Sequence, residues 1–408
     1  MKKIAIFNDY QLPLPAVKGG SVPTLTTMIL EENERLKKYK IDVFSSYDEE
    51  ALLQSKKYTN TRFFFSKQAK VVRFLTNLSF KTKINFVDLM RIPLPFDAKR
   101  QFKANDYDLV YINGYIRGAY PIIKSANGAV IVHHHVVTDL IHEKSIIGEQ
   151  IINEADTVCF DSDFARKFAQ TGTQEQNQKM IPFPNAIYTE RFKFENAKEI
   201  RKEIRDKHNI SDTDILVIFV GRMVESKGCI ELIRAFNNAS FGDSVKLMII
   251  GGATYSSTKV TPYVNLCLEE SKPNKNIILT GYIAYEDLPQ YYKAADISTL
   301  ISRCNEACGL VGIESMAAGL PVITTNRGGI GEYVTDDCKI ITPDDENLIS
   351  SIEQALKTLV ADKDLRKKMG EEGKKVAQLF TKEIYFKTFC DIVESTCEKR
   401  KAKNDIEI

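Results

Sequence analysis

Residues 303–329 read RCNEACGLVGIESMAAGLPVITTNRGG, and this stretch predicts the fold class of the chain. It contains a helix-favouring run, a break at Gly319 and Pro321, a short apolar strand and a double glycine. A helix that leads directly into an apolar strand is the repeating unit of a parallel β-sheet. Two glutamates, Glu306 and Glu314, lie before and inside the helix-favouring run. The fold does not require carboxylates there, so both are candidates for a functional role.

The same alternation of apolar strands and amphipathic helices continues along the whole chain. Strand-like segments in the first half include KIAIF, YDLVYING and GAVIVHHH, and those in the second half include DILVIFVG, VKLMIIGG, NIILTG and PVITT. This order predicts an α/β protein with doubly wound parallel sheets that helices cover on both faces. A length of 408 residues exceeds a single typical core, so two domains are expected.

A segment around Pro182 and Pro184 has little periodicity and separates the two halves of the chain. We therefore predict an N-terminal domain at 1–182, a linker at 183–197 and a C-terminal domain at 198–380. Residues 381–408 are expected to form a helix that packs back toward the N-terminal domain and ends in a polar tail.

The composition is that of an ordinary globular protein, with 43% hydrophobic and 27% charged residues. No apolar run reaches the ~18 residues of a membrane-spanning helix. Too few apolar residues precede Asn8 for a signal peptide, so Ile4–Phe7 is expected to be the first strand. The eight cysteines form no CxxC pair, which favours reduced thiols and a cytoplasmic location. Cys304 and Cys308 lack a second ligand pair, so no zinc site is expected.

The segment 51–87 carries eight lysines and arginines, no acidic residue and several interleaved aromatic residues. A basic, aromatic surface is typical of proteins that bind anionic membrane lipid or nucleic acid. The alternative is a solvated loop and helix face over a local hydrophobic cluster. Both interpretations remain open from the residues alone.

Two glycine turns expose backbone amides to a possible anion. Gly19 and Gly20 follow the loop after the first strand and precede a helix. Gly309 is expected to stand directly before a helix at 310–318, which leaves the amides of Leu310 and Val311 without partners inside the helix. Amides at a helix N-terminus bind phosphate groups well.

A third turn, FVGRMVESKGC at 219–229, carries two cations. Arg222 and Lys227 lie on either side of the turn, between a buried strand and the next helix. A guanidinium and an ammonium at a helix N-terminus suit a diphosphate, although surface salt bridges are the alternative. Glu306 and Glu314 suit vicinal hydroxyl groups, such as those of a ribose or a hexose, because carboxylates accept two hydrogen bonds.

These motifs together resemble the retaining family 4 glycosyltransferases of GT-B architecture. The resemblance rests on the E-x7-E spacing of Glu306 and Glu314, on the A-x-G-x-P-V-I-T and GG-x-x-E motifs that follow, and on G-R-x4-K-G at 221–228. VKGGSV, VIVHHH, FDSDFARKF, IPFPNAIYTERF and LMIIGG also occur in the expected order. The resemblance implies two Rossmann-like domains facing across a cleft, with the acceptor bound by the N-terminal domain and the nucleotide sugar by the C-terminal domain.

The resemblance also implies a role for each candidate residue. Glu314 would bind the ribose hydroxyls, and Glu306 would hold the donor hexose and its phosphates with the amides that follow Gly309. Arg222 and Lys227 would neutralise the departing diphosphate, so no metal ion or other cofactor is expected. Further roles fall to Gly20, which would let the N-terminal domain approach the phosphates, and to Tyr282 and Ile283, which would line the base pocket.

A histidine at the end of the strand VIVHHH would face the donor sugar near its anomeric carbon. Because side chains alternate along a strand, His133 and His135 share one face and His134 lies on the other. His135 is favoured because it is nearest the carboxyl end of the strand, but the residues do not settle which histidine faces the donor.

Other enzyme classes fit the sequence less well. The triplets DSD at 161–163 and DTD at 212–214 resemble the metal site of GT-A transferases, but a helix cap at Ser162 or Asp163 and a turn before a strand explain both. No G-x-G-x-x-G follows a strand, which argues against a dinucleotide-dependent oxidoreductase. A nucleotide-sugar epimerase of GT-B architecture and a non-catalytic subunit of a polysaccharide assembly complex remain as alternatives.

The sequence thus predicts a metal-independent hexosyltransferase. Its expected partners are a nucleotide-sugar donor, with UDP favoured, and a glycan or lipid-linked acceptor of surface polysaccharide or glycoconjugate synthesis. Contact with the inner face of the membrane through 51–87 is expected, and nucleic acid is not. The sugar, the linkage and the oligomeric state do not follow from the residues.

Overall fold

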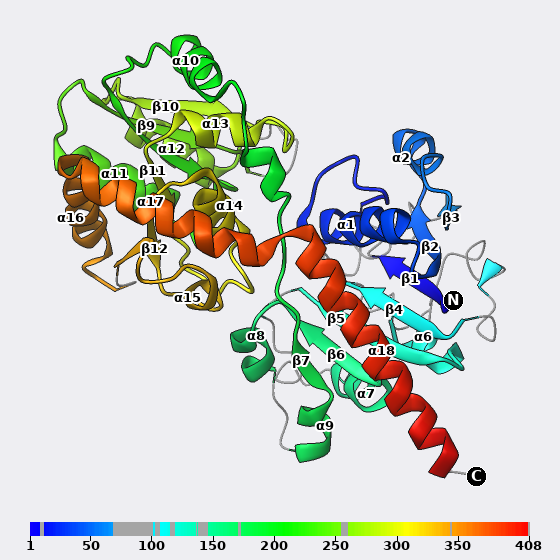
Figure 1. The fold of residues 1–408 in the computed structure, drawn as a ribbon. Coiled ribbons are helices and arrows are strands. Elements are labelled where there is room, and N and C mark those ends of the chain that lie inside the picture. The colour runs from blue at the N-terminus through cyan, green and yellow to red at the C-terminus, as the bar shows by residue number, and fades with distance from the viewer. Residues whose placement is uncertain are drawn as a thin grey trace. The chain divides into compact units, whose positions relative to one another are not determined.

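The structure is a computed structural model that describes residues 1–8, 12–67, 101–102, 107–114, 119–135, 137, 146–169, 173–253, 260–342 and 345–406. The chain divides into two compact units. The N-terminal unit comprises residues 1–185 and 382–408, and the C-terminal unit comprises residues 186–381. Each unit is an α/β domain built on its own parallel sheet (Figure 1).

The described strands of the N-terminal unit form a seven-stranded parallel sheet in the order β3-β2-β1-β4-β5-β6-β7. These strands are β1 (Lys3–Asn8), β2 (Lys40–Ser46), β3 (Thr61–Ser66), β4 (Leu109–Asn113), β5 (Ala129–His134), β6 (Thr157–Phe160) and β7 (Met180–Pro182). The helices described around them are α1 (Ser21–Leu36), α2 (Glu49–Ser55), α6 (Ala119–Ser125), α7 (Ile146–Glu154), α8 (Asp163–Phe168), α9 (Gln174–Gln178) and α18 (Lys382–Ile406).

Helix α18, red in Figure 1, packs against α1 and β5 and so completes the N-terminal unit from the far end of the chain. Phe389 is fully buried and stacks edge-on against Tyr111 of β4, with ring centroids 5.2 Å apart. Glu394 accepts hydrogen bonds from the Tyr39 hydroxyl and the Lys2 ammonium. The N-terminal unit therefore needs residues from both ends of the sequence to close its core.

The C-terminal unit has a second parallel sheet, in the order β10-β9-β8-β11-β12-β13. Its strands are β8 (Ile215–Val220), β9 (Val245–Ile250), β10 (Ile277–Gly281), β11 (Ile297–Leu300), β12 (Val322–Thr325) and β13 (Lys339–Thr342). Its helices are η2 (Thr189–Phe192), α10 (Ala197–Lys207), η3 (Glu225–Lys227), α11 (Cys229–Ala239), α12 (Pro262–Ser271), α13 (Leu288–Ala294), α14 (Leu310–Ala318), α15 (Ile330–Tyr333), α16 (Leu348–Ala361), α17 (Lys363–Ala377) and η4 (Gln378–Phe380).

Strand β8 shows why helices cover both faces of this sheet. Val217 and Phe219 belong to the core under α11 and α16, whereas Leu216 and Ile218 belong to the opposite core under α10 and α13. A strand that is apolar on both sides must be buried on both sides, as in other parallel sheets. Residues 186–197, within the expected linker, pack onto this unit, and Ile187 is buried beside α14 and α15.

Both sheets have a topological switch point, where the connections that follow two neighbouring strands lead toward opposite edges of the sheet. The switch point lies between β1 and β4 in the N-terminal unit and between β8 and β11 in the C-terminal unit. In open α/β sheets, ligands bind beyond the carboxyl ends of the strands at this point. The turns after β8 and β11 hold Arg222, Lys227 and Glu306, which places these candidates at the switch point of their sheet.

Several local predictions are confirmed. Helix α14 begins at Leu310 and ends at Ala318, as the sequence indicated, and Gly309 is its N-cap. Ser162 caps α8 by accepting a hydrogen bond from the amide of Ala165, so the DSD triplet includes a helix cap. The DTD triplet ends in a turn just before β8. Of the basic segment 51–87, only residues 51–67 lie within the described chain.

The close contact between the ends of β8 and β9 predicts a strict need for glycine at position 251. Gly251 has a φ of +144°, and a Cβ there would lie 1.8 Å from the carbonyl oxygen of Gly221. Gly251→Ala is expected to lower the free energy of unfolding of the C-terminal unit by at least about 2 kcal/mol, measured by urea denaturation. Gly242→Ala is the control, because nothing lies within 4 Å of a Cβ there; equal effects of the two substitutions would contradict the prediction.

Candidate functional site

The turns after β8 and β11 bring Lys227 and Glu306 together. The Glu306 carboxylate accepts hydrogen bonds from the Lys227 ammonium and from the Ser302 hydroxyl. Lys227 is followed by Gly228, which has a φ of +64°. A Cβ at this position would lie 2.1 Å from the carbonyl oxygen of Ile301. Only glycine allows this approach, and the approach places the ammonium next to the turn that carries Glu306.

Arg222 lies at the start of the same turn and is exposed. It directly follows Gly221, whose amide donates to the carbonyl oxygen of Ile250 at 3.0 Å. Among the described residues, the Arg222 guanidinium has no hydrogen-bond or ion-pair partner. The turn therefore presents one fixed cation, Lys227, and one cation that is available to a ligand.

The N-terminus of α14 adds backbone donors to this group. Gly309 has a φ of +81°, and no side chain caps the helix, so the amides of Leu310 and Val311 donate to no capping side chain. The preceding loop is fixed by the amide of Gly329, which donates to the carbonyl oxygen of Glu306 at 2.8 Å. Uncapped amides beside two cations form a site of positive potential, which suits an anion such as a diphosphate.

Glu314 lies farther along α14 and is buried. Its Oε2 accepts a hydrogen bond of 2.9 Å from the Tyr292 hydroxyl on α13. Burial raises the pKa of Glu314 to about 7, although the bond from Tyr292 and the charge of Arg191 both oppose this shift. The two glutamates therefore differ in chemistry: Glu306 is paired with a cation, whereas Glu314 sits where its charged form is disfavoured.

The surroundings of Glu314 include aromatic residues that the sequence did not single out. The Arg191 guanidinium lies 4.4 Å and 5.1 Å from the ring centroids of Tyr188 and Tyr285. Ile283, expected near a base pocket, is partly buried and packs against the core on this side of the sheet, whereas Tyr282 is exposed. The segment 186–192 thus supplies an arginine near Glu314, which only the tertiary structure reveals.

The remaining candidates, Gly19, Gly20 and His135, belong to the N-terminal unit. Gly19 and Gly20 have φ values of +67° and +95°, and Gly20 is the N-cap of α1. No side chain caps α1, so its first turn resembles that of α14 in offering backbone amides. These residues lie at the carboxyl-end edge of their own sheet, where a ligand of the N-terminal unit would bind.

The three consecutive histidines alternate as predicted. His133 and His135 both face Asp161, which follows β6, whereas His134 packs on the other side against Phe160 with ring centroids 6.0 Å apart. Asp161 Oδ1 lies 3.2 Å from His133 Nε2 and 2.7 Å from His135 Nδ1. The sequence indicates Asp161 only as part of a helix-cap or metal motif, and it does not predict the buried contact of this residue with two histidines.

A signal for Asp161 was present in the strand pairing. Strands β5 and β6 are parallel neighbours in which His134 is paired with Phe160. The residues that directly follow these two strands are His135 and Asp161, and they lie at the same edge of the sheet. Burial alone would raise the pKa of Asp161, but the two histidines outweigh it and hold this pKa below its usual range. Burial also lowers the pKa of His133, to about 4.

Most of the C-terminal unit is similar to a known protein family. Residues 200–376 match the family model of the glycosyl transferases group 1. The matched part of the chain contains Arg222, Lys227, Glu306 and Glu314.

Individual relatives extend the similarity to nearly the whole chain. The putative glycosyltransferase YtcC of Bacillus subtilis is 25% identical over 93% of this chain and 88% of its own length. The capsular polysaccharide biosynthesis glycosyltransferase CapM of Staphylococcus aureus is 30% identical over 49% of this chain and 50% of its own. The structure of HepE from Anabaena in complex with UDP and glucose matches 97% of this chain and 100% of its own, with 19% identity and a TM-score of 0.73. This likeness confirms the expected GT-B fold class.

The raised pKa of Glu314 predicts a pH dependence of stability. The folded protein holds this proton up to about pH 7, whereas the unfolded chain loses it near the ordinary value of 4.5. The free energy of unfolding should therefore fall as pH rises between these values, by at most roughly 3 kcal/mol. Glu314→Gln removes the ionisation, so thermal melting across this range should show wild type losing stability relative to the variant. Glu286→Gln, an exposed control, should leave the wild-type pH dependence intact; parallel profiles for Glu314→Gln and wild type would refute the prediction.

Proposed function

We propose that this protein is a retaining glycosyltransferase that moves a hexose from a nucleoside diphosphate sugar to a glycan or lipid-linked acceptor. The observation that carries the proposal is the convergence of Arg222, the Lys227–Glu306 pair and the uncapped N-terminus of α14 at one switch point. This combination lies inside the segment that matches the group 1 glycosyltransferases. A nucleotide diphosphate supplies both the negative charge and the hydroxyl groups that these residues bind best.

The donor is assigned by matching each of its parts to the group of opposite chemistry. The diphosphate would accept hydrogen bonds from Arg222, Lys227 and the amides of Leu310 and Val311. The ribose would donate its hydroxyl hydrogens to Glu314, and the hexose would be held by Glu306. We favour UDP because HepE, which shares the fold, was solved with UDP and glucose.

The proposed mechanism is dissociative and retains the anomeric configuration. The bond between the anomeric carbon and the phosphate oxygen lengthens first, and negative charge grows on the departing diphosphate. Arg222 and Lys227 stabilise this charge, a role that needs no metal ion. The departing phosphate oxygen then accepts the proton of the acceptor hydroxyl, which attacks from the same face. Glu306 holds the Lys227 ammonium in position through its ion pair and needs no proton transfer of its own.

The acceptor is proposed to be a glycan or lipid-linked intermediate of surface polysaccharide synthesis, at the inner face of the cell membrane. CapM, a capsular polysaccharide glycosyltransferase, supports this choice. No helix in the described ranges is both long and apolar enough to span a bilayer. Contact with lipid would instead use a surface of the N-terminal unit.

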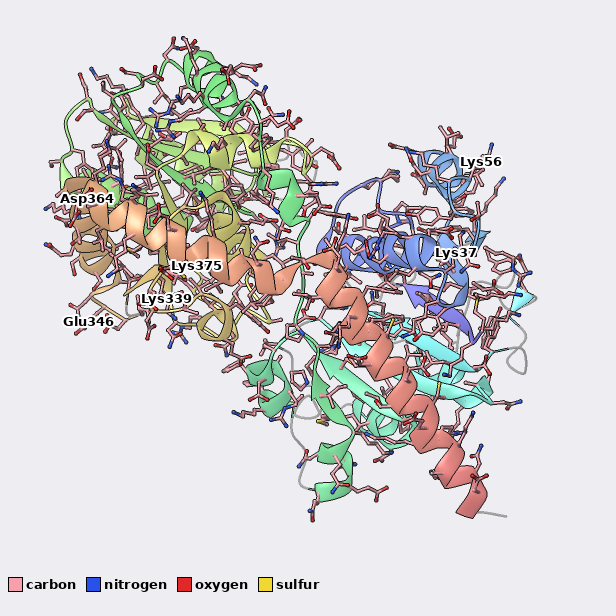
Figure 2. All side chains as sticks on the ribbon, in the orientation of Figure 1. Lys37, Lys56, Lys339, Glu346, Asp364 and Lys375 are labelled. Carbon is pink, nitrogen blue, oxygen red and sulfur yellow. The ribbon has the colours of Figure 1, made fainter. Side chains whose placement is uncertain are left out.

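Helix α2 and strand β3 provide such a surface within residues 51–67. Leu52 and Leu53 are 39% and 61% exposed, and the exposed Lys56 and Lys57 follow them (Figure 2 labels Lys56). Apolar side chains beside lysines are typical of interfacial membrane contacts. Arg62 belongs to the same segment, but it already pairs with Asp42.

The transfer reaction itself is tested with a radiolabelled nucleotide sugar and a membrane extract as acceptor. Transfer moves the label into a glycan or lipid product and releases nucleoside diphosphate. An epimerase would return the label as a different nucleotide sugar, and a non-catalytic subunit would leave the donor unchanged. Either outcome would overturn the proposed function.

Lys227→Ala is expected to lower kcat by roughly 100-fold or more, because it removes a cation that stabilises charge in the transition state. Steady-state kinetics with saturating donor measures the change. Lys272→Ala, at the exposed C-cap of α12, is the matched control and should retain wild-type kcat. Chelation of divalent metal should leave wild-type activity intact. Full activity of Lys227→Ala, or loss of activity on chelation, would contradict the metal-independent mechanism.

The double substitution Lys56→Glu and Lys57→Glu is expected to weaken binding to anionic vesicles several-fold, because each lysine near such a surface contributes about 1 kcal/mol. Flotation with vesicles of phosphatidylglycerol and phosphatidylcholine, against phosphatidylcholine alone, measures the effect. The control is Lys367→Glu with Lys368→Glu, an adjacent exposed pair on α17. Binding that is equal for both vesicle types would argue against this membrane surface.

A further inference from the structure

Arg191 is a cation of the C-terminal unit whose hydrogen-bond donors are not used within the structure. Its guanidinium lies over the rings of Tyr188 and Tyr285, 4.4 Å and 5.1 Å from their centroids, and these cation–π contacts hold the charge in place. Within the described part of the chain, no oxygen accepts a hydrogen bond from this guanidinium, and its Nη1 is buried. A buried N–H group without an acceptor costs free energy, which a ligand oxygen would restore.

Helix η2, which carries Arg191, lies beside the Tyr292–Glu314 pair. It packs against α13, which carries Tyr292, and against α14, which carries Glu314. Phe192, the next residue in η2, packs against the Tyr292 ring with centroids 5.9 Å apart. Burial raises the pKa of Glu314 and the charge of Arg191 lowers it, so the guanidinium is close enough to act on the carboxyl group. No ion pair joins the two side chains directly in the described ranges.

Glu314 has one carboxylate oxygen that is available to a ligand. The Tyr292 hydroxyl donates to Oε2 at 2.9 Å, whereas Oε1 accepts no hydrogen bond from any described residue. Glu314 is 6% exposed, so it is buried without being sealed from solvent. A ligand hydroxyl can donate its hydrogen to Oε1, but its own oxygen then needs a hydrogen-bond donor, which an ionised carboxylate cannot supply. Arg191 is the neighbouring group that can supply it.

We propose that Arg191 is a nucleotide-binding residue that donates an N–H hydrogen bond to the same ribose hydroxyl that donates its hydrogen to Glu314. This inference rests on the proposed function, in which Glu314 binds the ribose of the nucleotide sugar. Arg191 and Glu314 are then the two halves of a hydroxyl-binding site, one of which donates while the other accepts. Both residues belong to the C-terminal unit, so the site needs no group of the N-terminal unit.

This arrangement predicts a choice between ribose and deoxyribose. A nucleotide that carries the hydroxyl satisfies both Arg191 and Glu314. A nucleotide that lacks it leaves an N–H group and a carboxylate oxygen without partners. A site built to bind a hydroxyl group therefore rejects the analogue that lacks this group.

A phosphate oxygen is the competing ligand for Arg191. The diphosphate is assigned to the N-terminus of α14, where Leu310 begins the helix. Glu314 lies four residues farther along, which is about 6 Å on the helix axis. Because Arg191 acts on Glu314, it is expected on the ribose side of the diphosphate. The two assignments differ in one measurable respect, since a phosphate contact would weaken nucleotides and deoxynucleotides equally when Arg191 is replaced.

The test is a cycle of protein variants and ligand analogues, measured by isothermal titration calorimetry. UDP, ADP and GDP are titrated into wild type, and the tightest of them is compared with its 2′-deoxy and 3′-deoxy forms. One deoxy form should bind wild type about tenfold more weakly or worse, as the loss of a charged hydrogen bond requires. Arg191→Met, which keeps an apolar stem against the tyrosines, should weaken the parent nucleotide by a similar factor. In this variant the penalty for the missing hydroxyl should shrink to a few-fold, because the hydroxyl has already lost its donor.

Arg234→Met is the matched control. Arg234 lies on α11, where it pairs with Glu270, and α11 covers the opposite face of the sheet from α13. This variant should keep the wild-type affinity and the wild-type penalty. Arg191→Lys is a second variant in case Arg191→Met does not fold. It keeps the charge but replaces the planar fork by one ammonium group, so the penalty should again be smaller than in wild type.

The outcomes separate this inference from the proposed function. Equal penalties for the missing hydroxyl in wild type and Arg191→Met would overturn the role of Arg191 alone, as would unchanged binding of the parent nucleotide to Arg191→Met. No penalty for either deoxy form in wild type would remove the ribose from this site. If none of the three nucleotides binds wild type, the proposed donor is wrong and this inference falls with it.

A measurement without nucleotide tests the placement of Arg191 beside Glu314. Burial raises the pKa of Glu314 and Arg191 opposes this rise, so in Arg191→Met the folded protein should hold the proton to a higher pH. The free energy of unfolding should therefore go on falling beyond the pH at which it levels off in wild type. Burial raises the pKa values of Tyr292 and Tyr285, which also face Glu314, so both keep their protons in this range. Thermal melting between about pH 5 and pH 9 measures the upper limit, and an unchanged limit would overturn the placement.

Discussion

The carbonyl oxygen of Ile301 occupies the space that a side chain at position 228 would need, and the candidate site of the C-terminal unit depends on this contact. Because the backbone of the β8 turn can approach the end of β11, the Lys227 ammonium reaches the Glu306 carboxylate. The loop that carries Glu306, whose carbonyl oxygen accepts from the Gly329 amide, leads to Gly309 and the uncapped amides of α14. A single close approach of backbone thus aligns cations, carboxylate and amides.

The two units use charge in different ways. In the C-terminal unit, Lys227 and Glu306 are partly exposed, so solvent and ligand can compete for each partner. In the N-terminal unit, Asp161 and the histidines around it are buried, where the charge of a carboxylate is weakly screened by solvent. The first arrangement suits the binding and release of a charged ligand, and the second suits the orientation of one side chain.

The fold followed from the sequence more completely than the site did. Strand periodicity and glycine turns are local properties, so they predicted two doubly wound sheets, the bounds of α14 and the cap at Ser162. The contacts of Asp161 with His135 and of Tyr292 with Glu314 join different elements. Such pairs depend on strand register and helix packing, which no single stretch of sequence specifies, although parallel pairing of β5 and β6 would have placed His135 beside Asp161.

Helix α18 belongs to the N-terminal unit although it follows the whole C-terminal unit in sequence. The C-terminal unit is therefore an insertion: the chain enters it after Asn185 and leaves it at Thr381. Its two ends are neighbours, since the amide of Ile187 donates to the carbonyl oxygen of Phe380 at 3.0 Å. A module with adjacent ends can be exchanged as one piece without disturbing its host. This topology gives a route by which evolution can replace the C-terminal unit while keeping the N-terminal unit, including its final helix, intact.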